Sequence, residues 1–172
     1  MIHNYTIVSN DIILRQLKEE DIEQLRNWRN NEENTKYLRK IGYITPTQQK
    51  EWFDNYLENN DELTFAIVEN KDLNRIVGSC SLYHFVDNQV EFGKILIGDS
   101  EAHGRGIGLC ATKAVVEFAF KELNISKVVL ECYEHNIPAQ KIYKKAGFIL
   151  TDEKRDDGFD KALFMSIQNS DI

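Results

Sequence analysis

The chain has 172 residues, of which 42% are hydrophobic and 28% charged, and its formal net charge of −7 corresponds to a pI of about 5.2. This length and composition predict one soluble globular domain spanning residues 1–172. The acidic balance argues against a nucleic-acid-binding protein, and no stretch has the roughly 18 consecutive apolar residues of a membrane span. Three cysteines without metal-ligand or CxxC spacing, and the lack of a signal-peptide pattern, predict a cytoplasmic protein.

The N-terminal part of the chain predicts one strand and two helices. A strand is expected over residues 12–17, and the acidic run 18–21 favours a helix start because helix N-termini stabilise negative charge. Apolar residues then follow at helical spacing up to Trp28. A second helix is expected from Pro46, since Thr45 can cap it and Gln48 stands three positions after the cap.

From Leu63 onward the apolar period changes to that of strands. Strands are expected over residues 64–68, 76–83 and 90–97, and turn signals at 71–74 and 87–88 join them into an antiparallel meander. A helix over 109–123, a strand over 127–133 and a helix over 138–146 that ends at Gly147 follow. Two final strands are expected over 148–150 and 162–167, with a turn at Asp156–Gly158 between them. The pattern predicts an α+β fold.

The stretch from His103 to Gly108 is the strongest local signal in the chain. Gly104, Gly106 and Gly108 stand at alternate positions directly before an apolar helical pattern. A helix N-terminus carries unpaired N–H groups and roughly half a positive charge, so a glycine-rich start is suited to bind phosphate. The simpler interpretation is that these glycines only form a tight turn into the helix.

The same stretch also fits a dinucleotide-binding fingerprint, G-x-G-x-x-A from Gly106 to Ala111, with Glu131 as the ribose-binding acid. Three features argue against that interpretation. In a dinucleotide-binding fold the first glycine follows its strand directly, whereas residues 98–102 intervene here. A meander precedes the loop instead of alternating strands and helices, and too few residues follow Ala111 to complete a doubly wound sheet. The P-loop pattern G-x-x-x-x-G-K-[ST] is also absent.

Two segments together resemble the GNAT family of N-acetyltransferases. Residues 91–98 and the loop that follows closely resemble the family's acetyl-CoA motif, Gln/Arg-x-x-Gly-x-Gly/Ala, with His103, Gly106 and Gly108 at its fixed positions. Residues 136–148 look like the family's second signature. The resemblance covers about residues 11–167. It implies the GNAT fold, a mixed, mostly antiparallel sheet of six to seven strands flanked by about four helices.

The resemblance implies acetyl-CoA as the co-substrate and no metal. A backbone N–H near Leu96 and Ile97 would bind the thioester carbonyl, and the pantetheine arm would add to the same strand edge. His103 departs from the usual Gln or Arg, which implies weaker binding of CoA at most, because the loop binds phosphate mainly through backbone N–H groups. Asn136 is expected to bind pantetheine, to cap its helix, or both. The implied cofactor-binding residues are Ile95, Leu96, Ile97, His103, Gly104, Arg105, Gly106, Ile107, Gly108, Leu109, Asn136 and Lys145.

Two residues are the candidates for acid–base catalysis. Tyr143 occupies the family's usual general-acid position, and a phenol with a pKa of about 10 is protonated at neutral pH and can donate to the leaving thiolate. The alternative is a tyrosine at the edge of the core. Glu91 is the candidate base, either directly or through water, and a structural partner of a neighbouring strand is the alternative. The histidines outside the glycine loop show no ligand spacing and are interpreted as structural: His3, His84 and His135.

The acceptor site is implied to lie at residues 28–52, at Tyr83 and at the turn around Gly158, with Arg29, Asn30 and Tyr83 as its candidate residues. The Trp-Arg-Asn segment looks like the subgroup that acetylates nucleotide-linked amino sugars, and the chain is also similar to ribosomal-protein N-terminal and spermidine acetyltransferases. Arg29 suits a phosphate or carboxylate, or a helix-end salt bridge, while the acidic chain favours a polyamine.

The expected function is transfer of an acetyl group from acetyl-CoA directly to a primary amine of a small molecule. A non-catalytic acetyl-CoA-binding module is the alternative from another class. No nucleic acid or membrane is expected as a partner, and a homodimer is left open.

Overall fold

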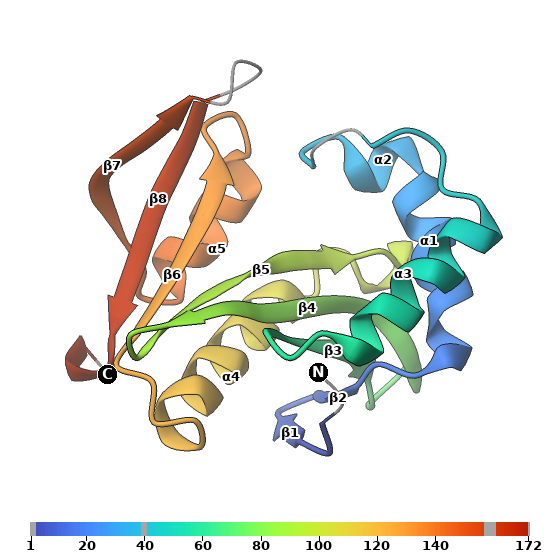
Figure 1. The fold of residues 1–172 in the computed structure, drawn as a ribbon, viewed down its shortest axis with the longest axis horizontal. Coiled ribbons are helices and arrows are strands. Elements are labelled where there is room, and N and C mark those ends of the chain that lie inside the picture. The colour runs from blue at the N-terminus through green and yellow to red at the C-terminus, as the bar shows by residue number, and fades with distance from the viewer. Residues whose placement is uncertain (1–2, 39–40, 157–160, 172) are drawn as a thin grey trace.

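Eight strands form one sheet in the part of the chain that the computed structural model describes, residues 3–38, 41–156 and 161–171 (Figure 1). Their order is β1-β2-β3-β4-β5-β6-β8-β7. The strands are β1 (Thr6–Ser9), β2 (Ile12–Gln16), β3 (Glu62–Glu69), β4 (Arg75–Val86), β5 (Gln89–Ile97), β6 (Lys127–Tyr133), β7 (Ile149–Asp156) and β8 (Lys161–Gln168). The α-helices are α1 (Ile22–Asn30), α2 (Glu32–Thr35), α3 (Pro46–Glu58), α4 (Ile107–Lys121) and α5 (Ile137–Lys145). The predicted α+β class is confirmed.

The sequence did not predict β1 and α2. β1 is a four-residue edge strand in which Val8 is 68% exposed, so its sequence lacks the alternation of a half-buried strand. α2 is a four-residue helix without buried residues. By contrast, the predicted start of α3 is confirmed, since Thr45 and Gln48 form a capping box around Pro46. The predicted turn at Gly158 lies outside the described residues.

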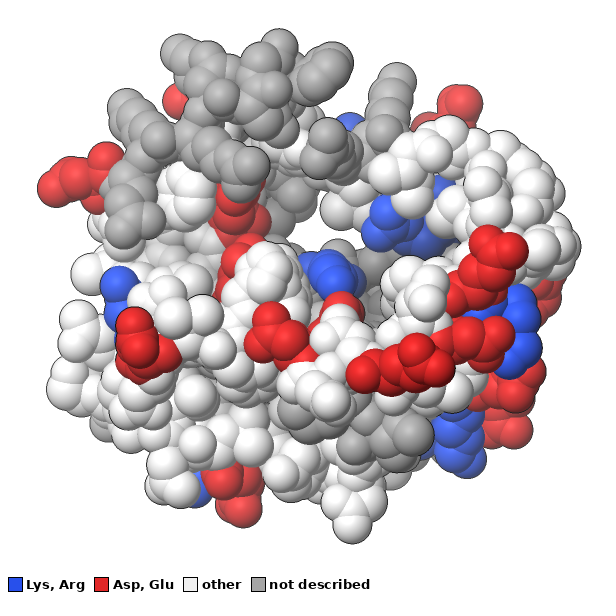
Figure 2. All heavy atoms as spheres, viewed as in Figure 1, with Lys and Arg blue, Asp and Glu red and all other residues white. Residues whose placement is uncertain are grey.

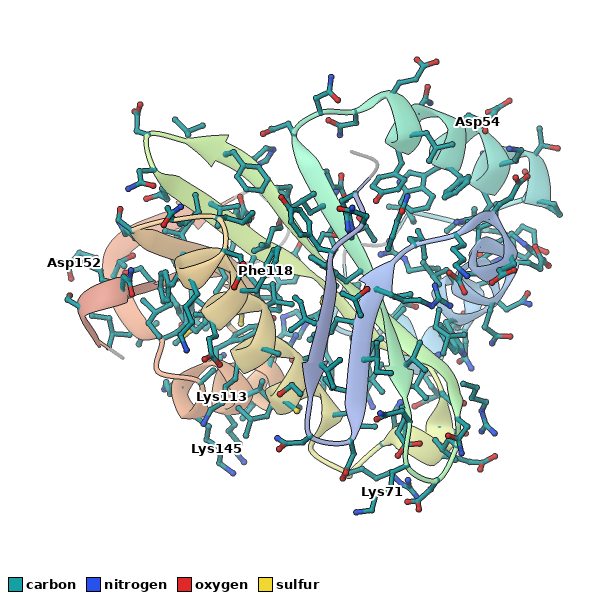
Figure 3. All side chains as sticks on the ribbon, turned by 90° about the horizontal axis from the view of Figure 1, so that it is seen from below. Asp54, Lys71, Lys113, Phe118, Lys145 and Asp152 are labelled. Atoms are coloured by element: carbon teal, nitrogen blue, oxygen red, sulfur yellow. The ribbon has the colours of Figure 1, made fainter. Side chains whose placement is uncertain are left out.

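The helices cover the two faces of the sheet. α4 and α5 pack on one face, where Phe118 of α4 contacts Phe65 of β3 (Figure 3). α1 and α3 pack on the other face, against Ala66 and Leu96. Residues 65 and 66 face opposite sides because side chains alternate along a strand. None of the helices in the described part of the chain is long and apolar enough to cross a membrane.

The sheet divides where β5 meets β6. These two strands are paired in parallel only at Gln89–Glu91 and Lys127–Val129, and all other strand pairs are antiparallel. Beyond Glu91 and Val129 the strands diverge, and Figure 1 shows β6, β7 and β8 leaning away from β5. The sheet therefore contains a wedge-shaped opening lined by the second half of β5 and of β6.

Two β-bulges lie between β4 and β5. Lys94 and Ile95 oppose the single residue Cys80, because the register passes from Ser79↔Leu96 to Ser81↔Gly93. Lys94 has a left-handed backbone, with φ +51°. His84 and Phe85 oppose the single residue Val90, and His84 has φ +53°. Bulges change the direction in which side chains point and are common beside active sites.

Glu69 fastens the turn between β3 and β4. Its carboxylate is only 2% exposed and accepts hydrogen bonds from the backbone N–H groups of Lys71, Asp72 and Leu73. Burial alone would raise the pKa of Glu69, but these N–H donors outweigh burial and lower the pKa below its ordinary value. A carboxyl group with a lowered pKa stabilises the fold above its unfolded pKa, and this contribution is lost as the pH falls through the folded pKa.

We expect Glu69→Gln to lower the thermal midpoint at pH 7 by a few degrees, because the amide cannot accept all of these bonds as strongly as a carboxylate. The difference from wild type should shrink as the pH falls below the ordinary glutamate pKa of about 4.3. Thermal unfolding of both proteins from pH 7 to below this pKa measures the difference in thermal midpoint. The exposed Glu51 on α3 supplies the control variant, Glu51→Gln. A difference that stays constant with pH would contradict the assigned role of the Glu69 charge.

Candidate active site

Two adjoining cavities follow β5 where it separates from β6. One has a volume of about 710 Å³ and is lined by residues that include Glu91, Tyr83 and Cys132. The other, of about 440 Å³, reaches Ile97, His103 and Gly108. The residues that line both cavities are Tyr37, Leu38, Ile95, Asn136, Ala139 and Tyr143. The cavities therefore form one cleft, and Figure 2 shows a hollow near the centre of this face with Lys and Arg atoms on its walls.

The glycine loop forms the far end of the cleft and the start of α4. Gly106 is the N-cap of α4, with φ +77° and no side chain that caps the helix. The first backbone bond of the helix runs from the N–H of Cys110 to the carbonyl of Gly106, so the N–H groups of Ile107, Gly108 and Leu109 lack an intrahelical partner. A Cβ added at Gly104 or Gly106 would meet no atom within 4 Å. The loop thus presents free donors to open space, as anion binding requires.

The edge of β5 supplies backbone groups to the same cleft. The carbonyl of Leu96 points at Gly78 of β4, so the neighbouring residues Ile95 and Ile97 direct their backbone groups toward the cleft. The carbonyl of Ile97 accepts a hydrogen bond from Nε2 of His103 at 2.8 Å. Of the three predicted residues 95–97, Leu96 therefore faces β4 with its backbone, and it is among the residues that line the 440 Å³ cavity.

Two other predicted cofactor-binding residues, Asn136 and Arg105, lie around this end, and a third, Lys145, lies on α5. The side chain of Asn136 accepts a hydrogen bond from the N–H of Ala139 at 3.2 Å, which confirms its capping role at α5. Arg105 is paired with Asp72 at 3.0 Å, so its contact with pyrophosphate stays a prediction. Lys145 is exposed in the last turn of α5, and Figure 3 shows it on the same side of the ribbon as Lys113 of α4.

Tyr143 of α5 lies at the junction of the two cavities. It is 5% exposed, and its ring packs edge-on against Phe92 and Phe148. Burial, together with the nearby thiols Cys132 and Cys80, raises the pKa of Tyr143 above its ordinary value. Its phenol therefore keeps its proton at neutral pH, as a proton donor must.

Glu91 is held by two side chains from β4. The hydroxyl of Tyr83 donates a hydrogen bond to Oε1 at 2.7 Å, and Nδ1 of His84 lies 3.0 Å from Oε2. Burial, and then the bond to Glu91, raise the pKa of Tyr83. Gly93 leaves room for this arrangement, because a Cβ there would collide with the Tyr83 ring. The predicted residues Tyr83 and Glu91 thus form one hydrogen-bonded unit.

A third cavity of about 540 Å³ lies between α1, α3 and the sheet. Arg29 and Lys94 line this cavity and also the 710 Å³ cavity, so the two adjoin. Its mouth carries the exposed apolar side chains of Ile41 and Tyr43, and its floor carries the buried carboxylate of Glu62. The chemistry of the cavity thus changes from apolar at the mouth to charged at the floor.

Arg29 differs from the other arginines whose side chains the structure describes. Arg15, Arg26, Arg75 and Arg105 each pair with a carboxylate, whereas the guanidinium of Arg29 makes no ion pair or hydrogen bond within the described residues. Its Nε atom is fully buried, and burial lowers the pKa of Arg29 from its ordinary value. The expected alternative, a helix-end salt bridge, is absent from the described part of the chain. The guanidinium is therefore available for an anion in the cavity.

The sequence model of the acetyltransferase (GNAT) domain family matches residues 11–149. The chain belongs to the GNAT acetyltransferase family. The N-acetyltransferase 9-like protein of Caenorhabditis briggsae is 25% identical over 155 residues, which cover 84% of this chain and 78% of that protein. The predicted family membership and the predicted acyltransferase class are thereby confirmed.

Two solved structures share the GNAT fold with this chain. Spermidine N-acetyltransferase from Vibrio cholerae, in complex with CoA and spermine, has a TM-score of 0.80 at 21% identity, over 94% of this chain and 97% of that one. FdhC without ligand, described as a nucleotide-linked sugar GNAT, has a TM-score of 0.80 at 24% identity, over 98% of this chain and 93% of that one. The GNAT fold expected from the sequence is confirmed, with eight strands and five α-helices described.

In this GNAT domain, Asn30 has a different position from the one expected. Its side-chain amide bonds both the N–H and the carbonyl of Ile44, at 2.8 and 2.9 Å, and it does not line the 540 Å³ cavity. Asn30 therefore fixes the segment that carries Tyr43 at the mouth. Its direct contact with an acceptor stays a prediction.

Sequence reasoning missed Lys94 and Glu62. Nζ of Lys94 lies 2.7 Å from Oε2 of Glu62 and 4.7 Å from the centre of the Tyr83 ring. Thr64 binds the other carboxylate oxygen of Glu62. The bulge that directs Lys94 here has no local sequence signal, because it depends on the register of two strands. Within the described residues, no group of three His, Cys, Asp or Glu side chains is arranged to hold a metal.

Proposed function

We propose that this GNAT enzyme transfers the acetyl group of acetyl-CoA directly to a primary amine of a small molecule that also carries an anionic group. A nucleotide-linked amino sugar is such a molecule. One observation carries the proposal: Glu91 and Tyr143 line the same 710 Å³ cavity, which lies between the glycine-loop cavity and the cavity beside Arg29. A donor and an acceptor that enter from the two ends would meet between a base and an acid.

The reaction forms a C–N bond and breaks the C–S bond of the thioester. In this proposal Glu91 takes a proton from the amine, and the Tyr143 hydroxyl gives a proton to the leaving sulfur. The backbone groups of Ile95 and Ile97, with Leu96 between them, would hold the pantetheine arm and the acetyl carbonyl. Asn136 would add a side-chain contact.

The glycine loop would hold the pyrophosphate. The N–H groups of residues 106–109 are suited to it because they point from a helix start into open space. The remaining contacts proposed from the family motif are His103, Gly104, Arg105 and Lys145. The CoA bound by the Vibrio cholerae neighbour supports acetyl-CoA as the co-substrate.

Arg29 supports an anionic group on the acceptor. A half-buried guanidinium without a partner in the described residues is costly, and a phosphate or carboxylate would satisfy it through paired hydrogen bonds. Tyr83, next to Glu91, would contact the amine end, and Asn30 would act through the loop that it fixes. The description of FdhC as a nucleotide-linked sugar GNAT is consistent with this acceptor class.

A polyamine is the second candidate. Three carboxylates line the 540 and 710 Å³ cavities, those of Glu62, Glu91 and Glu131, and they would attract a cationic chain. The Vibrio cholerae neighbour is a spermidine N-acetyltransferase. We favour the anionic acceptor because Glu62 is already paired with Lys94, whereas Arg29 is not paired within the described residues.

Release of free CoA thiol from acetyl-CoA over a panel of amines tests the proposal. The panel pairs each phosphorylated or nucleotide-linked amino sugar with the same sugar without its anion, and adds spermidine. We expect turnover with kcat/KM at least about tenfold higher for the anionic member of each pair, which corresponds to roughly 1.4 kcal/mol. Higher kcat/KM for spermidine would favour the second candidate, and acetyl-CoA binding without turnover would favour a non-catalytic module. A cytoplasmic location and a homodimer also stay predictions.

A further inference from the structure

Two consecutive residues of β4 reach the same carboxylate. Tyr83 and His84 bind the two oxygens of Glu91, at 2.7 and 3.0 Å. Successive side chains of a regular strand point to opposite faces of the sheet, so a regular strand cannot make this arrangement. The bulge at His84 and Phe85, with φ +53° at His84, makes it possible. A left-handed backbone at a residue other than glycine is uncommon, and here it serves one contact.

The three side chains lead from the cleft to the solvent. Tyr83 and Glu91 both line the 710 Å³ cavity. The side chain of Glu91 is 24% exposed, whereas that of His84 is 68% exposed. The imidazole has two nitrogen atoms, and with Nδ1 facing Glu91 its Nε2 is left for exchange with water. An ionisable group in the cavity is thus joined to an ionisable group at the surface.

We infer that His84 carries protons from Glu91 to the solvent during acetyl transfer. The inference rests on the proposed function. An ammonium acceptor loses one proton before it attacks and a second when the amide forms, while the leaving thiolate takes up one proton. One proton must therefore leave the site in each turnover. Glu91 takes it from the amine and, once protonated, gives it from Oε2 to Nδ1 of the Nε2–H tautomer of His84. The resulting imidazolium releases its Nε2 proton to water, and exchange of the ring protons with water restores the starting tautomer.

Other charged groups lie around Glu91, on β6, β5 and β3. On β6, Glu131 also lines the 710 Å³ cavity, and Lys127 lines a smaller cavity together with Glu91. On β5, Lys94 lies over the Tyr83 ring and pairs with Glu62 of β3. Within the described residues, His84 is the exposed ionisable side chain that contacts a carboxylate oxygen of Glu91.

His84→Asn is the variant that tests the relay. Asparagine tolerates a left-handed backbone and keeps a hydrogen-bond donor for Glu91, but it cannot carry a proton. In dilute buffer we expect kcat to fall roughly 10- to 100-fold, a loss at or below the lower end of the range for general acid–base groups. The KM values for acetyl-CoA and the acceptor should stay within about twofold. Added imidazole should restore kcat in the variant and leave wild type unchanged, between about pH 6 and pH 9.

The possible results distinguish a failure of the His84 proton relay from a failure of the proposed acetyl transfer. Tyr83→Phe should lower kcat without rescue by imidazole, because it removes a hydrogen bond to Glu91 and leaves the path through His84 intact. An unchanged kcat for His84→Asn in dilute buffer would overturn the relay, as would a loss that imidazole does not restore, since either result reduces His84 to a structural role. Absence of transfer by wild type to every amine of the panel would overturn the proposed function itself.

Discussion

Replacing Tyr143 by phenylalanine is expected to lower kcat for thiol release by at least about 100-fold, the lower end of what a general acid contributes. The change removes one hydroxyl group and keeps the ring that packs against Phe92 and Phe148, so the fold should not change. KM for acetyl-CoA should stay within about twofold, because the hydroxyl acts on the sulfur as it leaves and not on the bound thioester. Initial rates of thiol release at several acetyl-CoA concentrations measure both constants.

The raised pKa of Tyr143 gives a second readout. Burial holds this pKa above its ordinary value of about 10, so the donor stays protonated throughout the neutral and mildly alkaline range. Wild-type kcat should therefore not decline up to about pH 9 through loss of this proton. Tyr5→Phe, which removes the hydroxyl of a partly exposed tyrosine, is the matched control and should keep wild-type rates. Normal turnover by Tyr143→Phe with a good acceptor would remove Tyr143 from the mechanism.

Replacing Arg29 by methionine is expected to lower activity and to raise stability. Hydrogen bonds to charged groups contribute about 1.5–3 kcal/mol, so kcat/KM for an anionic acceptor should fall roughly 10- to 150-fold. The thermal midpoint without ligand should rise, because methionine fills a similar volume and removes a desolvated charge that lacks a partner in the described residues. Steady-state kinetics with paired acceptors and thermal unfolding without ligand measure the two effects.

Two further variants isolate the role of Arg29. Arg29→Lys keeps the charge but loses the planar pair of donors, so its kcat/KM for the anionic acceptor should lie between those of wild type and Arg29→Met. Lys71→Met removes a cation from an exposed position, and both kcat/KM and the thermal midpoint should stay at wild-type values. An equal loss of kcat/KM for acceptors with and without the anion would contradict the assignment of an anion site. A fall in thermal midpoint for Arg29→Met would show that the guanidinium is structurally required.

The sequence predicted those parts of the fold that are encoded locally. The capped start at Thr45–Pro46 and the helix end at Gly147 depend on nearby residues alone, and both are confirmed. The apolar periods of β3–β5 and of α4 also needed no knowledge of distant contacts. β1 could not be predicted because an exposed four-residue edge strand has almost no pattern.

The candidate site was predictable where its chemistry lies in the backbone of one short segment. The glycine loop is such a segment, and its free N–H groups follow from three glycines before a helix. The contacts of Glu91 and Arg29 depend instead on distant strands and helices. His84 meets Glu91 only because of a bulge, and the lack of a partner for Arg29 within the described residues depends on where carboxylates distant in the sequence lie. A single sequence contains no local signal for either.

The short parallel pairing between β5 and β6 makes the stability of the fold depend on what is bound in the cleft. Three residue pairs, Gln89–Glu91 with Lys127–Val129, join the C-terminal strands to the rest of the sheet. A ligand that touches β5 on one wall of the cleft and α5 on the other would hold these two parts of the fold together while it is bound. At 100 times its Kd such a ligand adds about 2.7 kcal/mol, as much as two to five ordinary hydrogen bonds. We therefore expect donor binding to stabilise the fold against unfolding, and release of CoA to remove that stabilisation once in every cycle.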